Sequence, residues 1–153
     1  MIRLQRAELS DAETIWKMQV RCFAPLLKKY QDYGTSPAAE SLEKVVARIN
    51  QPFTYFYLVR HKDETVGAIR IVDKKDSTRK RISPLFILPE YRCNGFARLA
   101  ITEAEYLHGA EQWALDTILQ ESGLCRFYEK LGYKDTGKRE KINDKLTLVF
   151  YEK

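Results

Sequence analysis

Two kinds of hydrophobic spacing run along the chain and predict a mixed α/β protein. Apolar residues recur every three or four positions within residues 15–27, 42–49, 95–108 and 124–131, and this spacing predicts four helices. Residues 53–60, 65–72, 81–88, 113–119, 133–138 and 145–151 are rich in β-branched and aromatic side chains, and residues 2–5 alternate; both patterns predict strands. The order β-α-α-β-β-β-α-β-α-β-β predicts a mixed sheet with helices on both faces.

Capping residues and prolines indicate where these elements begin or break. Ser10–Glu13 has the form of a capping box, which predicts the start of the first helix. Pro25 lies late in that helix and is expected to kink or split it. Ser36–Pro37 is expected to begin the second helix. Pro84 removes a hydrogen-bond donor from the third long strand, which predicts a bulge or an unpaired edge there.

Length and composition indicate one domain over residues 1–153. The chain has 153 residues, of which 44% are hydrophobic, enough to build a core without disulfides or metals. It has no apolar run of membrane-spanning length, and its first twenty residues lack the apolar core of a signal peptide. Its three cysteines are scattered, which suits free thiols in a reducing compartment. We therefore expect a cytoplasmic protein without a membrane partner. The net charge of +5 is dispersed, which argues against nucleic acid as a partner.

The segment from residue 85 to residue 98 carries the strongest chemical signal. A buried strand runs into a short loop that opens directly into a helix at Gly95. The first amides of a helix lack intrahelical partners and face its positive dipole end, which favours binding of anions such as phosphate. Gly95 and Ala97 are small enough for close backbone approach, and Arg92 and Arg98 add positive charge. A phosphate site and an ordinary turn both fit these residues.

Two motifs resemble those of the GNAT superfamily of acyl-CoA-dependent N-acyltransferases. Arg92-Cys93-Asn94-Gly95-Phe96-Ala97 matches the pyrophosphate-loop pattern Arg/Gln-x-x-Gly-x-Gly/Ala, and Pro89-Glu90-Tyr91 before it is typical of that family. Phe127-Tyr128-Glu129-Lys130-Leu131-Gly132-Tyr133 looks like the family's C-terminal segment. The order of the elements also agrees, so the resemblance covers essentially the whole chain. It implies a three-layer αβα fold, with a largely antiparallel sheet of about six or seven strands and about four helices on both faces.

The resemblance implies an enzyme that transfers an acetyl group from acetyl-CoA to a primary amine by direct attack in a ternary complex, without a metal. Backbone groups of Leu85, Phe86 and Ile87 would pair with the pantetheine arm. The loop and the first turn of the helix would hold the pyrophosphate. The residues implied there are Arg92, Cys93, Asn94, Gly95, Phe96, Ala97 and Arg98.

Proton transfer would involve further groups. By the resemblance, Tyr128 would protonate the departing thiolate, although simple packing beside Leu124 and Leu131 also fits its position. An alkylamine with an ordinary pKa of ~10.4 is protonated at pH 7, so the reaction needs a proton acceptor. By the same resemblance, Asp116 is the favoured base, because relatives that acetylate protein N-termini carry an acidic base on this strand; a solvent-exposed or capping aspartate is the alternative. Glu121 stands where many relatives carry an asparagine that contacts the cofactor. Whether Glu121 makes that contact or instead lines the amine site is left open.

Other functions stay open at this point. A catalytically silent CoA-binding regulatory module would keep the loop around Gly95 without needing Tyr128. A basic protein that binds nucleic acid is a further class. No spacing of cysteine and histidine matches a metal site. The resemblance allows a homodimer, and the sequence does not choose among a polyamine, a free amino acid and a protein amine as acceptor.

Overall fold

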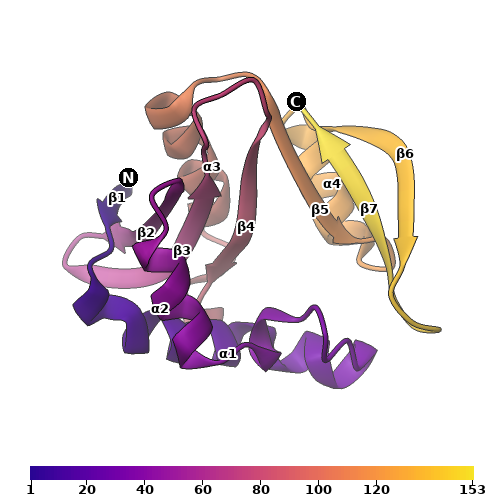
Figure 1. Cartoon of the computed structure of the whole chain (residues 1–153), viewed down its shortest axis with the longest axis horizontal. Helices are drawn as coiled ribbons and strands as arrows, with labels where there is room; N and C mark the ends of the chain where they lie inside the picture. Colours follow the sequence, from indigo (N-terminus) through magenta and orange to yellow (C-terminus); the bar gives the residue numbers. More distant parts are fainter.

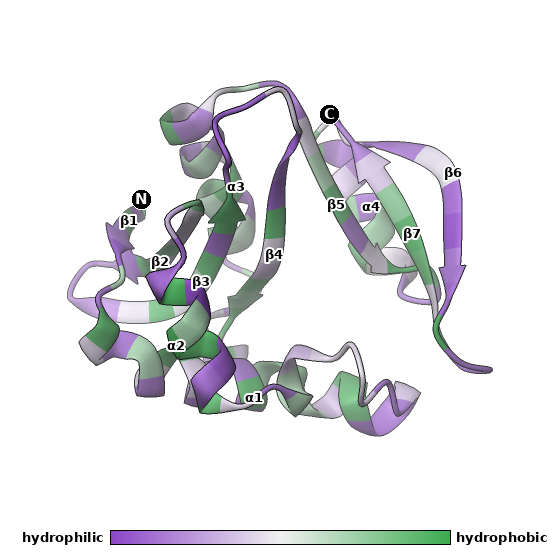
Figure 2. Cartoon of the chain, viewed as in Figure 1, coloured by the Kyte–Doolittle hydropathy of each residue, from purple (hydrophilic) through white to green (hydrophobic).

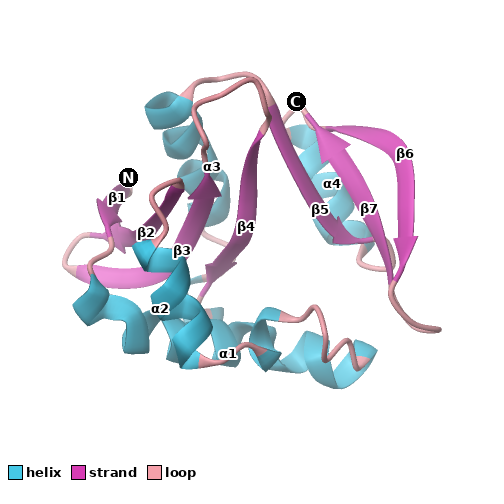
Figure 3. Cartoon of the chain, in the orientation of Figure 1, coloured by secondary structure: helices cyan, strands magenta, loops and turns pink.

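One seven-stranded sheet forms the middle layer of the molecule (Figure 3). In the computed structural model, which describes residues 1–153, the strand order is β1-β2-β3-β4-β5-β7-β6. All neighbouring strands are antiparallel except β4 and β5, which are parallel. The strands are β1 (Arg3–Arg6), β2 (Thr54–His61), β3 (Glu64–Val72), β4 (Lys80–Ile87), β5 (Trp113–Ile118), β6 (Lys134–Lys141) and β7 (Thr147–Glu152).

Two helices lie on each face of the sheet (Figure 1). The pair on one face is α1 (Ala12–Tyr30) and α2 (Leu42–Asn50), and the pair on the other is α3 (Phe96–His108) and α4 (Ser122–Lys130). Short 3-10 turns span Leu9–Asp11, Pro37–Ala39 and Pro89–Tyr91. This three-layer αβα arrangement around a largely antiparallel sheet confirms the predicted fold. None of the helices combines the length and the apolar character that a membrane crossing requires.

Each helical layer covers a core of its own, and the sheet's apolar residues divide between the two. Figure 2 shows hydrophobic segments along the middle strands, whereas β6 is mostly hydrophilic. Ile15 of α1 and Val45 of α2 pack with Phe56 on the first face, whereas Ile101 of α3 packs with Trp113 on the second. The α1 and α2 pair lies over β2 and β4, while β6 is exposed along its whole length. The first face of β5, β7 and β6 is therefore left open (Figure 1).

The first helix differs from the prediction at two points. It is continuous through Pro25. A proline removes only one donor from a helix of nineteen residues, and this helix is held before Pro25 by the core and after it by the hydrogen bond from Tyr30 to Glu121. The 3-10 turn that precedes α1 is stabilised by the Asp11 carboxylate, which accepts a hydrogen bond from the Glu8 N–H at 2.8 Å. The predicted capping box over Ser10–Glu13 is therefore wrong.

The predicted second helix is interrupted. A 3-10 turn follows Ser36, and α2 begins only after Ser41, whose Oγ accepts the Lys44 N–H at 3.2 Å. Glu40 between them has extended backbone angles, and its carbonyl accepts the indole N–H of Trp16 at 2.9 Å. This contact with α1 turns the Glu40 carbonyl away from helical hydrogen bonding.

A bulge interrupts β4, as Pro84 predicts. Ile69 and Ile71 on β3 face Leu85 and Ile82 on β4, so β4 has one more residue than β3 across this interval. Beyond the bulge, β4 also loses its other neighbour. It pairs with β5 only at residues 80 and 81, and the two strands then diverge (Figure 1). The edge of β4 that faces β5 is unpaired from there to its end.

Candidate active site

The open edge of β4 turns backbone groups towards the gap beside β5. The Leu88 N–H donates to the Val66 carbonyl on β3 at 2.8 Å. Because successive residues of an antiparallel strand direct their backbone groups to opposite sides, the groups of Leu85 and Ile87 point towards β5. Phe86 instead directs its backbone to β3, and its side chain is buried in the core under α1. Leu85 and Ile87 therefore face the gap, and Phe86 does not.

One of these backbone groups already has partners. The Ile87 carbonyl accepts the Arg92 Nε–H at 3.0 Å and the Cys22 thiol at 3.6 Å. Burial raises the pKa of the Cys22 thiol, which therefore stays protonated and can donate. The Ile87 N–H and both backbone groups of Leu85 are left facing the gap. They form a short strand edge that an extended ligand can join by hydrogen bonds.

Six consecutive amides are free at the start of α3. The first hydrogen bond of the helix runs from the Leu99 N–H to the Gly95 carbonyl at 3.1 Å, and the N–H groups of residues 93–98 donate to no protein atom. Cys93 and Gly95 both have left-handed backbone angles, with φ of 65° and 78°. Free amides in a turn at the positive end of a helix dipole make a concave anion site.

Side chains around this loop hold its shape. The Glu90 carboxylate accepts both terminal nitrogens of Arg21 on α1, at 2.8 and 3.1 Å, and these hydrogen bonds lower the pKa of Glu90. The Tyr91 hydroxyl donates to Glu64. The Asn94 side-chain amide donates to the Tyr91 carbonyl at 3.0 Å. The loop is therefore tied to α1, to β3 and to itself.

The remaining loop residues contribute differently to the site. Phe96 is buried in the core under α3, and Ala97 packs against that core. The side chains of Cys93 and Arg98 are exposed. In this segment the backbone, rather than the side chains, supplies the free donors, and exposed Arg98 adds a positive charge beside them.

Tyr128 of α4 presents an unpaired hydroxyl on the α3 side of the sheet. Its ring packs edge-on against Phe127 and Tyr133, with centroids 5.0 and 6.0 Å apart. The hydroxyl makes no hydrogen bond within the protein. Burial, and then the negative charge of Asp116, raise the pKa of Tyr128 to about 12. The hydroxyl is therefore protonated at neutral pH and available as a donor.

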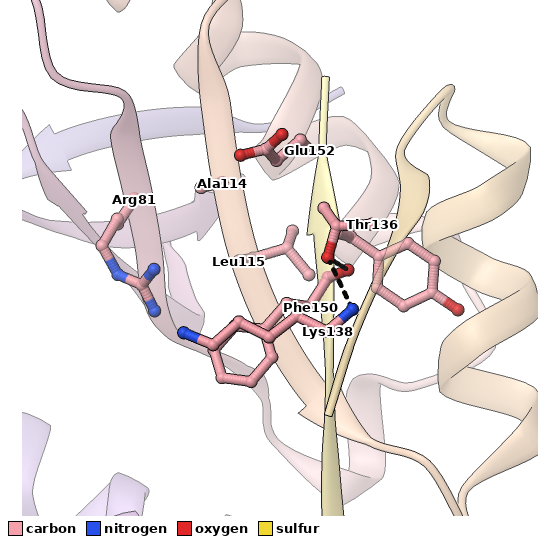
Figure 4. Close-up of a pocket in the computed structure, with 8 residues that line it drawn as sticks. Arg81, Ala114, Leu115, Thr136, Lys138, Phe150 and Glu152 are labelled. Atoms are coloured by element: carbon pink, nitrogen blue, oxygen red, sulfur yellow. Dashed lines mark hydrogen bonds between the residues drawn. The ribbon is translucent and has the colours of Figure 1, made fainter. Parts of the chain in front are cut away.

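Asp116 lies on β5 and points to the opposite, open face. Its Oδ2 pairs with the Arg81 guanidinium at 2.7 Å, and its Oδ1 has no protein donor. Arg81 also borders a hollow of about 360 Å³ on this face (Figure 4). The hollow is lined by Arg81, Ala114, Leu115, Thr136, Lys138, Phe150, Tyr151 and Glu152.

Glu121 joins elements that the sequence leaves far apart. Its carboxylate accepts the Tyr30 hydroxyl and, at 2.9 Å, the Lys29 ammonium. These hydrogen bonds, from Tyr30 first and then Lys29, lower the pKa of Glu121. Asn143 of the β6–β7 turn donates to the Tyr30 carbonyl at 2.9 Å. Glu121 therefore fastens the end of α1 to the start of α4, next to the β6–β7 turn.

One residue of this region carries a signal that the sequence analysis missed. Arg70 sits between two isoleucines on β3 and is 8% exposed, on the same face as Arg81. A charged residue at an inward position of an apolar strand is rare unless it is paired. That pattern could have marked Arg70 from the sequence.

Comparisons with known proteins agree with this geometry. Residues 27–153 match the sequence model of the acetyltransferase (GNAT) domain. A search of curated protein sequences finds no match. Among solved structures, the chain is similar to a spermidine N-acetyltransferase from Vibrio cholerae in complex with CoA and spermine, with a TM-score of 0.77, 18% identity, and coverage of 98% of this chain and 93% of that one.

Two further solved structures have the same fold. One is a PaiA N-acetyltransferase from Thermoplasma acidophilum in complex with coenzyme A, with a TM-score of 0.74, 17% identity, and coverage of 100% of this chain and 99% of that one. The other is the ribosomal-protein-S18-alanine N-acetyltransferase from Escherichia coli, with a TM-score of 0.74, 10% identity, and coverage of 99% and 92%. The first and the third of these proteins are named for different acceptors, spermidine and a ribosomal protein, so the shared fold does not select one.

Proposed function

Because this chain belongs to the GNAT acetyltransferase family and is an acyltransferase, we propose that it moves an acetyl group from acetyl-CoA to a primary amine of a small molecule or peptide. The amine attacks the thioester directly, within a ternary complex. The observation that carries the proposal is the run of six free amides over residues 93–98, next to the unpaired edge of β4. We place the enzyme in the cytoplasm, where its three free cysteines stay reduced.

Backbone groups bind the donor in this proposal. The amides of residues 93–98 and the dipole of α3 stabilise the pyrophosphate charge. The Ile87 N–H and the two Leu85 groups pair with the amides of the pantetheine arm, as an added strand would. A backbone N–H directed at the thioester oxygen also stabilises the negative charge that develops there during attack. Phe86 has no part in this pairing, because its backbone serves β3.

Tyr128 acts as the general acid. When the amine nitrogen bonds to the acetyl carbon, the carbon–sulfur bond breaks and the sulfur leaves with the electron pair. The Tyr128 hydroxyl, protonated because burial and Asp116 raise its pKa to about 12, donates a hydrogen bond and then its proton to that sulfur. Solvent afterwards returns a proton to the phenolate.

Asp116 accepts the proton that the amine loses. Its free Oδ1 faces the open side of the sheet, opposite the side of Tyr128. The two groups therefore serve the two sides of the gap, with the acid towards the sulfur and the base towards the incoming amine. Arg81 holds the carboxylate in place through Oδ2. A water molecule can relay the proton from the ammonium to Oδ1.

Binding and turnover test the proposal together. Acetyl-CoA binding is measured by calorimetry, and acetyl transfer to a pool of primary amines is measured by thiol release and mass spectrometry. Binding with turnover that depends on Tyr128 supports the enzyme. Binding without transfer to any amine supports the catalytically silent module instead. The matched control is Tyr106→Phe, because Tyr106 is 82% exposed on α3.

A further inference from the structure

Arg70 is a buried cation on the face of the sheet where the acceptor would approach. It pairs across β2 and β3 with Phe56, and both Phe56 and Ala68, two residues before Arg70, belong to the core under α1 and α2. Alternation along the strand places the Arg70 side chain on this same face. Only 8% of the residue is exposed.

The guanidinium of Arg70 is only partly satisfied. Its Nε–H donates to the Ser83 carbonyl in the bulge of β4, but its two terminal nitrogens reach no acceptor and no carboxylate. Both terminal nitrogens keep some contact with solvent. Burial, followed by the positive charge of Arg48, lowers the pKa of Arg70 to about 10.

The carboxylates near Arg70 are already engaged. Glu40 pairs with Arg48 at 2.7 Å, and Asp116 pairs with Arg81 at 2.7 Å. Three guanidinium groups therefore share two carboxylates, and Arg70 holds the surplus charge. A buried cation without a counterion is unfavourable, and an anionic ligand that reaches the free nitrogens relieves that cost.

The open face beyond Arg81 is positive as well. Figure 4 shows Arg81 and Lys138 directed towards each other across the hollow. Lys138 makes no ion pair, and its ammonium lies 4.4 Å from the centre of the Phe150 ring. Glu152 at the rim is paired with Arg79 at 3.2 Å. A ligand that brings a positive charge to this hollow is repelled by Arg81 and Lys138, whereas an anionic group is attracted.

Arg70 also lies close to the edge of β4 that would hold the thioester. Its partner Ser83 is two residues from Leu85, which is about 7 Å along a strand. An amine attacking beside Leu85 can therefore carry a second group that reaches Arg70. The planar guanidinium fork suits a carboxylate, which can accept two parallel hydrogen bonds.

We infer that the acceptor is a small amine that also carries a carboxylate, and that Arg70 binds this carboxylate. The inference rests on the proposed function, since it names the substrate class of that same site. It distinguishes this chain from an enzyme for polyamines, which carry positive charge at both ends. Arg70 is a specificity-determining residue in this view and takes no part in proton transfer.

Matched acceptor pairs test the substrate class. Each amino acid with a primary amine is compared with its own C-terminal amide, which lacks the carboxylate charge, and spermidine is assayed alongside. Because amidation also lowers the pKa of the amine, every kcat/KM is expressed per concentration of unprotonated amine. We expect kcat/KM at least tenfold higher for the best amino acid than for its amide. Equal or faster transfer to the amides or to spermidine overturns the inference. So does acetyl-CoA binding without transfer to either set, whereas failure to bind acetyl-CoA defeats the proposed function itself.

Variants of Arg70 separate a binding role from a structural one. Arg70→Met keeps about the length of the apolar stem and removes the charged guanidinium, so KM for the best amino acid should rise at least tenfold, with KM for acetyl-CoA and activity on the amide unchanged. Arg70→Lys keeps the positive charge but loses the planar guanidinium, so it should give a smaller rise in KM for the amino acid. This variant replaces Arg70→Met in the test if that protein does not fold. Arg3→Met, on the distant edge strand, is the control. An unchanged amino-acid KM in a folded variant refutes the role.

Discussion

Replacing Gly95 with aspartate or asparagine separates charge from shape at the anion site. Gly95 has a φ of 78°, and a Cβ placed there would meet only the Arg98 Nη2 atom, at 3.7 Å. Both replacements therefore fit sterically and differ in one negative charge. Asparagine and aspartate tolerate the left-handed region better than other side chains and are good residues at the start of a helix. The two variants should have similar stability, each about 1 kcal/mol below the wild type.

The charge makes the difference in affinity. A carboxylate ~6 Å from a diphosphate with two charges, at an effective dielectric constant of ~40, costs about 3 kcal/mol, or about 100-fold in Kd. The aspartate would also compete for the Arg98 guanidinium, which lowers affinity further. We therefore expect Gly95→Asp to bind acetyl-CoA about 100-fold more weakly than Gly95→Asn.

Calorimetric titration with acetyl-CoA at low and high salt measures this ratio. The ratio should shrink as salt rises, because the added charge is close to solvent and is screened. Gly137→Asp is a matched control, since Gly137 also has a positive φ and open surroundings but lies on β6. If Gly95→Asp and Gly95→Asn bind within threefold of each other, the amides of residues 93–98 do not hold the diphosphate.

Three further predictions follow from the same site. Acetyl-CoA at 100 times its Kd should raise the melting temperature by about 5–10 °C in scanning fluorimetry. Such a ligand adds about 2.7 kcal/mol to the free energy of unfolding, and the melting temperature of a chain of this size rises by about 2–4 °C per kcal/mol. No shift would count against any CoA-binding function. Tyr128→Phe should lower kcat by about 100-fold or less, with the Kd for acetyl-CoA unchanged; unaltered turnover would remove Tyr128 from the mechanism. The pKa of Tyr128 is about 12 in the folded protein and about 10 in the unfolded chain. The contribution of Tyr128 to stability is therefore fully present below about pH 10 and is lost between about pH 10 and 12. Urea unfolding over that range should show wild type losing about 3 kcal/mol more than Tyr128→Phe, and parallel profiles would contradict the raised pKa.

Local patterns were sufficient for the elements and for the bulge. The spacing of apolar residues predicted the order of strands and helices, because each element repeats its burial every two or 3.6 residues. Pro84 predicted the irregularity of β4, because its effect on the ladder is local. Pro25 and Ser36 misled at their boundaries. Packing of α1 overrode Pro25, and the contact between Trp16 of α1 and Glu40 interrupted the helix predicted from Ser36.

The run of free amides before α3 was predictable for the same reason. A strand, a turn with Gly95 and a helix follow one another within fourteen residues, and their free amides depend on backbone geometry alone. The direction of the backbone at Phe86 was not predictable. It depends on which register β3 and β4 adopt, and a shift of one residue would exchange the roles of Phe86 and Ile87.

The sequence alone was sufficient for the family, the layer architecture and the turn of free amides before α3, because hydrophobic periodicity and short motifs depend on residues close together in the chain. The tertiary structure decided which charges are satisfied. Arg81 meets Asp116, Glu121 meets Tyr30, and Arg70 is left without a counterion. Those outcomes depend on strand register, burial and distance between residues far apart along the chain, and electrostatic energies respond to all three.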